Sequence, residues 1–155
     1  MSVKYELWFV AMAVAISTLL LICAHASASS LEDSPTALAA LQAKADQAQP
    51  KDKCFLYAKL VSQMTDLAGR QFNSGDSGQA SETLKLVQQY ADKIQMGIAD
   101  DSKQLKPAEL LMRRTSFRLE GILRDASYEN RPALEATLTQ MNKVRTQLMM
   151  QVFTK

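Results

Sequence analysis

The chain has 155 residues, with 18 Lys and Arg against 16 Asp and Glu, and therefore a net charge of +2. This length suits a single domain, and so small a net charge points to no polyanionic partner. Two cysteines, Cys23 and Cys54, are too few for a disulfide framework.

The first 28 residues have the pattern of a secretory signal peptide. Lys4 and the α-amino group form a short positive start, residues 7–24 carry no charge, and small residues follow. The Ala-x-Ala pairs in this small-residue stretch predict cleavage after Ala26 or Ala28. The alternative is an uncleaved membrane anchor, because the uncharged run reaches the low end of the length that spans a bilayer. No cluster of Lys or Arg follows the run, so we expect a periplasmic or extracellular protein that meets a membrane only if this segment is retained.

Removal of the signal segment would take away Trp8, Cys23 and His25, the last being the only histidine of the chain. Histidine is the commonest general base and transition-metal ligand, so its loss argues against metal sites and Ser-His-Asp catalysis. The sequence also has no Gly-rich phosphate loop. The adjacent acids Asp100 and Asp101 lie in an expected loop, where solvated charges are ordinary. We therefore expect no metal, no cofactor and no enzymatic activity.

Residues 29–49 form an Ala-rich leader or short helix, and residues 50–155 form the helical domain. Four prolines mark places where a helical pattern begins, which is where proline is tolerated because the first helical N–H groups lack partners. These prolines are Pro35, Pro50, Pro107 and Pro132.

Four longer segments within residues 50–155 carry apolar residues at helical period, and alternation with period two is nowhere sustained. In the segment after Pro107 these residues are Ala108, Met112, Thr115, Leu119, Ile122 and Ala126, spaced 4-3-4-3-4. Such spacing is typical of helices that pack like coiled coils. We predict an all-α protein: an antiparallel bundle of four long helices plus a short N-terminal helix, preceded by the signal peptide.

One part of the domain resembles a tetratricopeptide helical hairpin. The matching small and apolar positions are Leu67, Ala68, Gly75, Asp76, Ala80 and Leu84. Gln71 stands where that pattern has an aromatic residue, and a stack of such hairpins normally needs several repeats. Whether the helices form a closed bundle or a tetratricopeptide-like stack is open at this stage.

Residues 103–124 carry six basic residues against two acids. Arg113, Arg114, Arg118 and Arg124 form a candidate partner surface, in which Arg114 and Arg118 share a helical face because they are four residues apart. A basic stripe suits an acidic protein or anionic lipid, and the alternative is a solvated face whose Arg stems cover apolar neighbours. Nucleic acid is not expected for an exported protein.

Two further features concern contacts with other molecules. Met149, Met150 and Phe153 end the chain with adaptable apolar side chains that suit a contact surface. Cys54 is interpreted as a buried thiol that acts as a small hydrophobe, and the alternative is an intermolecular disulfide in an oxidising compartment.

These patterns predict an exported, non-enzymatic helical protein that works through a protein partner or self-association. One alternative is a small periplasmic chaperone or stress protein, because residues 138–142 resemble the Leu-Thr-x-x-Gln motif of such families, with Asn142 in its last place. The other is a carrier of an apolar ligand within the helices, lined by methionines.

The signal peptide yields the first testable prediction. N-terminal sequencing and intact mass of the exported protein should show a chain that starts at Ser27 or Ser29. An exported protein that still begins at Met1 would establish the membrane anchor instead.

Overall fold

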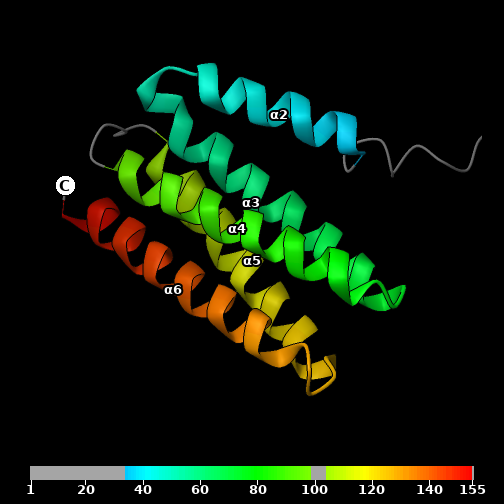
Figure 1. The fold of residues 1–155 in the computed structure, drawn as a ribbon. Helices are drawn as coiled ribbons and strands as arrows, with labels where there is room; N and C mark the ends of the chain where they lie inside the picture. Colours follow the sequence, from blue (N-terminus) through cyan, green and yellow to red (C-terminus); the bar gives the residue numbers. More distant parts are fainter. Residues whose placement is uncertain (1–33, 99–103, 155) are drawn as a thin grey trace, which may run out of the picture. The chain divides into compact units, whose positions relative to one another are not determined.

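The computed structural model describes residues 34–98 and 104–154, which form five helices and no strand (Figure 1). The all-α class is therefore confirmed for this part of the chain. The helices are α2 (Pro35–Gln47), α3 (Pro50–Asn73), α4 (Ser77–Gly97), α5 (Leu105–Asp125) and α6 (Arg131–Phe153). The expected signal peptide and the pair Asp100 and Asp101 lie outside the described residues.

Local chemistry explains where the helices begin and turn. Pro35, Pro50 and Pro132 each occupy one of the first two positions of a helix, where the missing N–H costs nothing. Ser34 caps α2 by accepting a hydrogen bond of 3.1 Å from the Ala37 N–H. Between α3 and α4 the chain reverses at Gly75, whose φ of 87° lies in the left-handed region that favours glycine.

The helices associate in five close pairs: α3 with α4, α5 with α6, α3 with α5, α4 with α6, and α2 with α3. Helices joined by short turns run antiparallel, as expected, and make two hairpins, α3–α4 and α5–α6 (Figure 1). Between the hairpins, however, α3 lies parallel to α5 and α4 parallel to α6. The consecutive helices α4 and α5 are not a close pair, so the pairings run in the circuit α3–α4–α6–α5.

Residues that contact each other between the two hairpins are separated by a nearly constant number of positions in the sequence. The Gln88 side-chain amide donates to the Thr137 hydroxyl at 2.7 Å across 49 residues. The Asn130 amide donates to the Ser77 hydroxyl at 3.1 Å across 53 residues, and Arg118 pairs with Asp66 across 52. The second hairpin thus lies beside the first as a shifted copy in the same direction, which explains the parallel pairing.

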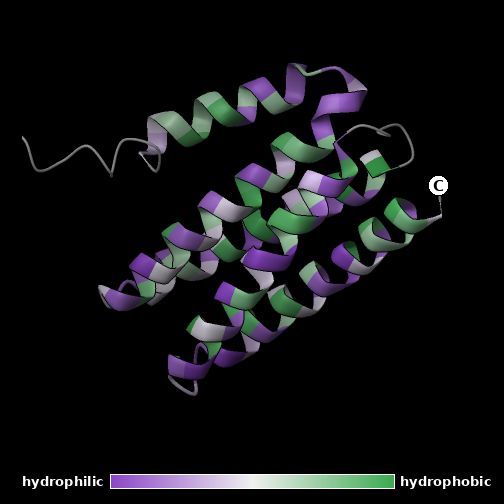
Figure 2. Cartoon of the chain, turned by 180° about the vertical axis from the view of Figure 1, so that it is seen from behind, coloured by the Kyte–Doolittle hydropathy of each residue, from purple (hydrophilic) through white to green (hydrophobic). Residues whose placement is uncertain are grey.

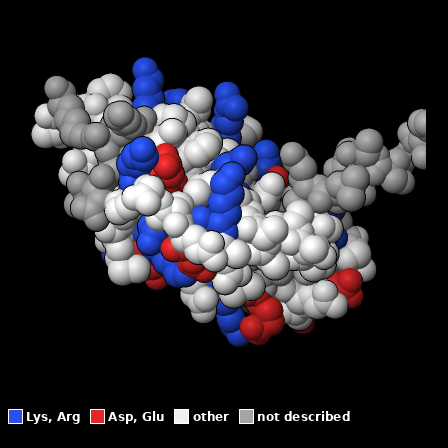
Figure 3. Space-filling view, turned by 90° about the horizontal axis from the view of Figure 1, so that it is seen from above, with Lys and Arg blue, Asp and Glu red and all other residues white. Residues whose placement is uncertain are grey.

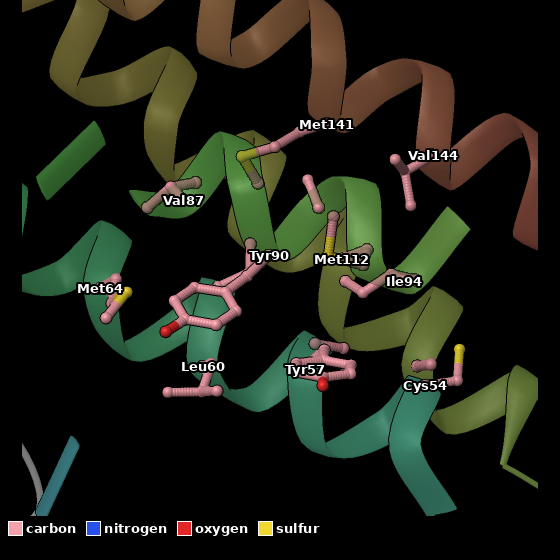
Figure 4. Close-up of a cluster of buried hydrophobic side chains, with 14 of the residues drawn as sticks. Cys54, Tyr57, Leu60, Met64, Val87, Tyr90, Ile94, Met112, Met141 and Val144 are labelled. Atoms are coloured by element: carbon pink, nitrogen blue, oxygen red, sulfur yellow. The ribbon is translucent and has the colours of Figure 1, made fainter. Parts of the chain in front are cut away.

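The core is built from one apolar face of each helix of the two hairpins. Ribbon colours alternate between hydrophobic and hydrophilic along these helices (Figure 2), as expected for helices with one buried side. The largest fully buried side chains include Leu60, Leu84, Ile94, Met112, Leu119, Leu134, Met141 and Leu148. Figure 4 shows side chains of all four helices converging on this core. Each large side chain contributes about 1.5–3 kcal/mol by leaving water.

Gly69 allows α3 and α5 to approach closely. A Cβ atom at this position would lie 2.9 Å from Ile122 Cδ1 of α5, closer than carbon atoms tolerate. On the exposed side of α5, a Cβ at Gly121 would meet only an Arg124 guanidinium nitrogen, at an ordinary 3.9 Å. Gly69 and Gly121 are therefore opposite cases: close helix packing requires the first glycine and does not require the second.

This contrast predicts different responses to alanine. Gly121→Ala should raise the free energy of unfolding by about 0.5–1 kcal/mol, the usual gain in helix propensity. In Gly69→Ala the same gain should be offset by the close contact between the new Cβ and Ile122. The free energy of unfolding of Gly69→Ala should therefore be at least about 1 kcal/mol lower than that of Gly121→Ala. Ile122→Val deletes the contacted methyl group, so in urea denaturation it should restore stability to Gly69→Ala. Equal stabilisation by the two alanines would contradict the close approach.

Candidate functional site

The four candidate arginines lie on the solvent side of α5. Arg113, Arg114, Arg118 and Arg124 are all exposed, whereas Met112 and Leu119 of the same helix are fully buried. The inner face of α5 therefore belongs to the core, and the arginines belong to its outer face.

The outer face also carries exposed apolar residues at a regular spacing. Leu110, Arg114, Phe117, Gly121 and Arg124 follow one another at intervals of 4-3-4-3, so they form one stripe along the helix, which we call the outer stripe. The side chain of Phe117 is 70% exposed and that of Leu110 is 37% exposed. The inner seam has the same spacing but starts at Ala108. A shift of two residues turns the helix by about 200°, so the stripe and the seam face opposite sides.

A shallow hollow lies along the outer stripe. Its lining is mainly apolar and comes entirely from α5: Arg113, Arg114, Phe117, Arg118, Gly121, Ile122 and Arg124. Gly121 forms a notch in this hollow, because it places no side chain between Phe117 and Arg124. Charge alone pointed to this segment in the sequence, and Phe117, between two of the arginines, was overlooked. Its 4-3-4-3 relation to Leu110 and Gly121 was the signal that could have found it.

The arginines differ in how far the protein itself neutralises them. Arg118 forms an ion pair with Asp66 of α3, and the Arg113 Nε lies 3.8 Å from the Glu109 carboxylate. For Arg114 and Arg124, no carboxylate within the described part of the chain lies in ion-pair range. Figure 3 looks at the molecule from above, from the side of α2, and on that face basic side chains lie beside acidic ones with uncharged areas between them. The outer stripe thus combines unmatched positive charge with apolar surface.

The second candidate surface, at the end of α6, is separate from the first. Met149, Met150 and Phe153 are exposed, and Met150 borders a hollow that also involves Gln95 of α4 and Ile98, the residue that follows this helix. This hollow shares no residue with the hollow on α5. The structure therefore places the predicted surface residues in two groups and does not bring them together.

Cys54 lies in the core near the beginning of α3 and is fully buried (Figure 4). This burial agrees with the interpretation of its thiol as a small hydrophobe. An intermolecular disulfide would require the first turns of α3 to separate from their neighbours.

A polar cluster that was not expected from the sequence holds α2 to the α3–α4 hairpin. The Tyr57 hydroxyl of α3 donates to Asp46 Oδ1 of α2 at 2.7 Å, and Lys93 Nζ of α4 donates to the same oxygen at 3.1 Å. The Tyr57 and Tyr90 rings stack with centroids 6.0 Å apart, and Lys93 Nζ lies 5.2 Å and 5.3 Å from their centroids. We call these four residues the tyrosine clasp.

Electrostatics favour a structural role for the tyrosine clasp. Burial and the hydrogen bond to Asp46 raise the pKa of Tyr57 to about 12, and burial raises the pKa of Tyr90. Hydrogen bonds from Tyr57 and Lys93 lower the pKa of Asp46. A phenol with a raised pKa is a poor source of a nucleophilic oxygen at neutral pH, so Tyr57 acts here as a hydrogen-bond donor.

Two other kinds of site are absent from residues 34–98 and 104–154. These residues contain no group of three or more His, Cys, Asp or Glu that could hold a metal ion. Their helices include none with both the length and the hydropathy needed to cross a membrane.

Comparisons with models of protein families, with curated proteins and with solved structures gave no match to this chain.

The tyrosine clasp predicts a specific cost for losing one hydroxyl group. Tyr57→Phe should lower the free energy of unfolding at pH 7 by about 0.5–1.5 kcal/mol, the usual range for one hydrogen bond. Since the folded pKa of Tyr57 is above its unfolded value of about 10, this stabilisation is complete below pH 10 and disappears as the pH rises towards 12. On the acid side, the lowered pKa of Asp46 means that its contribution is present above pH 3.8 and is lost as the pH falls further.

Tyr128→Phe is the matched control, because Tyr128 is 89% exposed and makes the same chemical change. Urea denaturation between pH 3 and pH 11 measures how the free energy of unfolding differs between Tyr57→Phe and Tyr128→Phe. Equal stability of the two variants at pH 7 would show that the Tyr57–Asp46 hydrogen bond contributes nothing to stability.

Proposed function

We propose that this chain is an exported, non-enzymatic helical protein that acts by binding a protein partner through the outer stripe of α5. The observation that carries the proposal is that α5 buries Ala108, Met112, Thr115 and Leu119 of its apolar seam and still exposes Leu110 and Phe117 on its opposite side. An aromatic residue among arginines is the composition that protein interfaces favour at their centre. The core does not need these residues, so their exposure is best explained by a contact with another molecule.

The proposal includes a view of the whole domain. Helices α3 to α6 form a closed four-helix bundle around one core, and α2 is attached to it by the tyrosine clasp. Such a bundle presents α5 as a rigid element, which lowers the entropic cost of binding. Residues 1–28 serve as the export signal, and the alternative is a protein anchored by that segment.

Absence of enzymatic activity is part of the same proposal. The only histidine, His25, precedes the folded domain, and Tyr57 is held in its protonated form by a raised pKa. The hollow on α5 offers arginine and apolar groups, which bind and orient but supply no general base at neutral pH.

A second candidate function is a small periplasmic chaperone, and the exposed apolar end of α6 at Met149, Met150 and Phe153 favours it. Adaptable methionine surfaces suit varied clients. For the apolar-ligand carrier, methionines were predicted to line the binding space, and the inward-facing ones include Met112 and Met141. Both are fully buried among core side chains, which favours a packing role for them.

Site-specific photo-crosslinking tests the proposal in cells that export the full chain. A benzophenone amino acid would replace Phe117, and in parallel strains Tyr128 or Met150. Position 117 should yield a discrete adduct with another protein, identified by mass spectrometry, and the exposed control position 128 should not.

Two results would contradict the proposal. One is the absence of any discrete adduct at position 117, and the other is a set of adducts shared equally with position 128. A broad range of client adducts confined to position 150 would support the chaperone instead.

A further inference from the structure

We infer that the outer stripe of α5 is a docking site for an acidic amphipathic helix of another protein. This inference rests on the proposed function and names the chemistry of the partner. It concerns an established mode of recognition, in which a helix lays its apolar face along a groove or a second helix.

The spacing of the outer stripe matches a helical partner. From Leu110 to Arg124 the stripe is about 21 Å long, at 1.5 Å per residue. Its intervals of 4-3-4-3 are those of a helix seam that packs by inserting side chains between those of a facing helix. A continuous helix of similar length can therefore contact the whole stripe, whereas an extended strand has a period of two.

Phe117 and Gly121 provide opposite shapes one turn apart. Phe117 projects from the helix with 70% of its surface exposed, and Gly121 leaves a notch whose Cβ position is bordered only by Arg124. A facing helix can accept the Phe117 ring between its side chains and place an apolar side chain into the notch. A phosphate headgroup has no such side chain, so the shape favours a protein over a lipid surface.

The charges around the outer stripe favour an acidic partner. Arg114 and Arg124, at two positions of the stripe itself, have no carboxylate in ion-pair range within the described residues. The acids nearby are Glu109, Glu120 and Asp125 of α5 and Asp66 of α3. Asp66 already pairs with Arg118, and Glu109 already pairs with Arg113. Carboxylates beside the apolar face of a partner helix would pair with the unmatched arginines and speed association.

A second copy of this chain does not offer the required face. Helices α2 and α6 contain one acid each, and α3 and α4 contain two each. Those of α4, Glu82 and Asp92, are ten residues apart and each already contacts a neighbouring side chain. No described helix outside α5 therefore presents acids in a row, which points to a different protein as the occupant.

Binding of designed peptides to the exported full-length protein tests the inference. The probe is a fluorescent 21-residue helical peptide with leucines along one face and glutamates on both sides of that face. The comparison peptide carries lysine in place of every glutamate. Fluorescence anisotropy should show that the glutamate peptide binds at least tenfold more tightly than the lysine peptide, with affinity falling as salt rises.

Variants of the stripe localise the binding. The double variant Arg114→Glu with Arg124→Glu should lower the affinity for the glutamate peptide at least tenfold. Phe117→Ser should lower that affinity by a similar factor. Gly121→Gln should also weaken it, although glutamine favours helix more than glycine and the fold has room for it. Lys85→Glu with Lys143→Glu makes the same charge change on α4 and α6 and should alter affinity less than twofold.

The outcomes separate this inference from the proposed function. Equal binding of the two peptides, or binding unchanged by Gly121→Gln, would overturn the inference. So would preferential binding to phosphatidylglycerol vesicles or to single-stranded DNA, which would make the stripe a surface for lipid or nucleic acid. A protein adduct at position 117 without glutamate-peptide binding would leave the proposed function in place and remove only the acidic helix as its partner.

Discussion

Burial of one apolar seam from each of α3, α4, α5 and α6 is the interaction on which the rest of the structure depends. Each seam occupies a single side of its helix. Burial of the seam in the core therefore also determines which residues of that helix face solvent. For α5, burying Met112 and Leu119 turns Phe117 and the arginines outward. The candidate binding surface is therefore a direct consequence of core packing and needs no loop or cleft to position it.

Helix periodicity made the core predictable. The seams of 4-3-4-3 spacing and the prolines at helix starts are local patterns, and the structure buries most of the apolar residues that the seams selected, with a few such as Ile122 only partly buried. Hairpins were predictable for the same reason, since a short turn leaves antiparallel packing as the only close arrangement. Local patterns do not state which faces of two hairpins meet, so the parallel pairing of α3 with α5 was not foreseen.

The features that the sequence did not reveal depend on contacts between distant residues. Asp46 and Lys93 meet across 47 residues, and neither belongs to a motif. Gly69 looks like a weak point in a helix until the position of Ile122 is known. The outer stripe is different, because its spacing is visible in the sequence. Phe117 was not predicted as a surface residue, because the apolar residues of the inner seam are sufficient to explain the helix and the basic residues alone define a candidate outer face.

The nearly constant separation between contacting residues of the two hairpins has a consequence for how the protein folds. Each hairpin can form through contacts that are local in sequence, which costs little chain entropy. The side-chain contacts described between α3 and α5 and between α4 and α6 close loops of about fifty residues, and the entropy of loop closure changes only slowly with length. The first inter-hairpin contact therefore bears nearly the whole entropic cost, and the others follow at little extra cost. This arrangement favours a single cooperative docking step between two preformed hairpins.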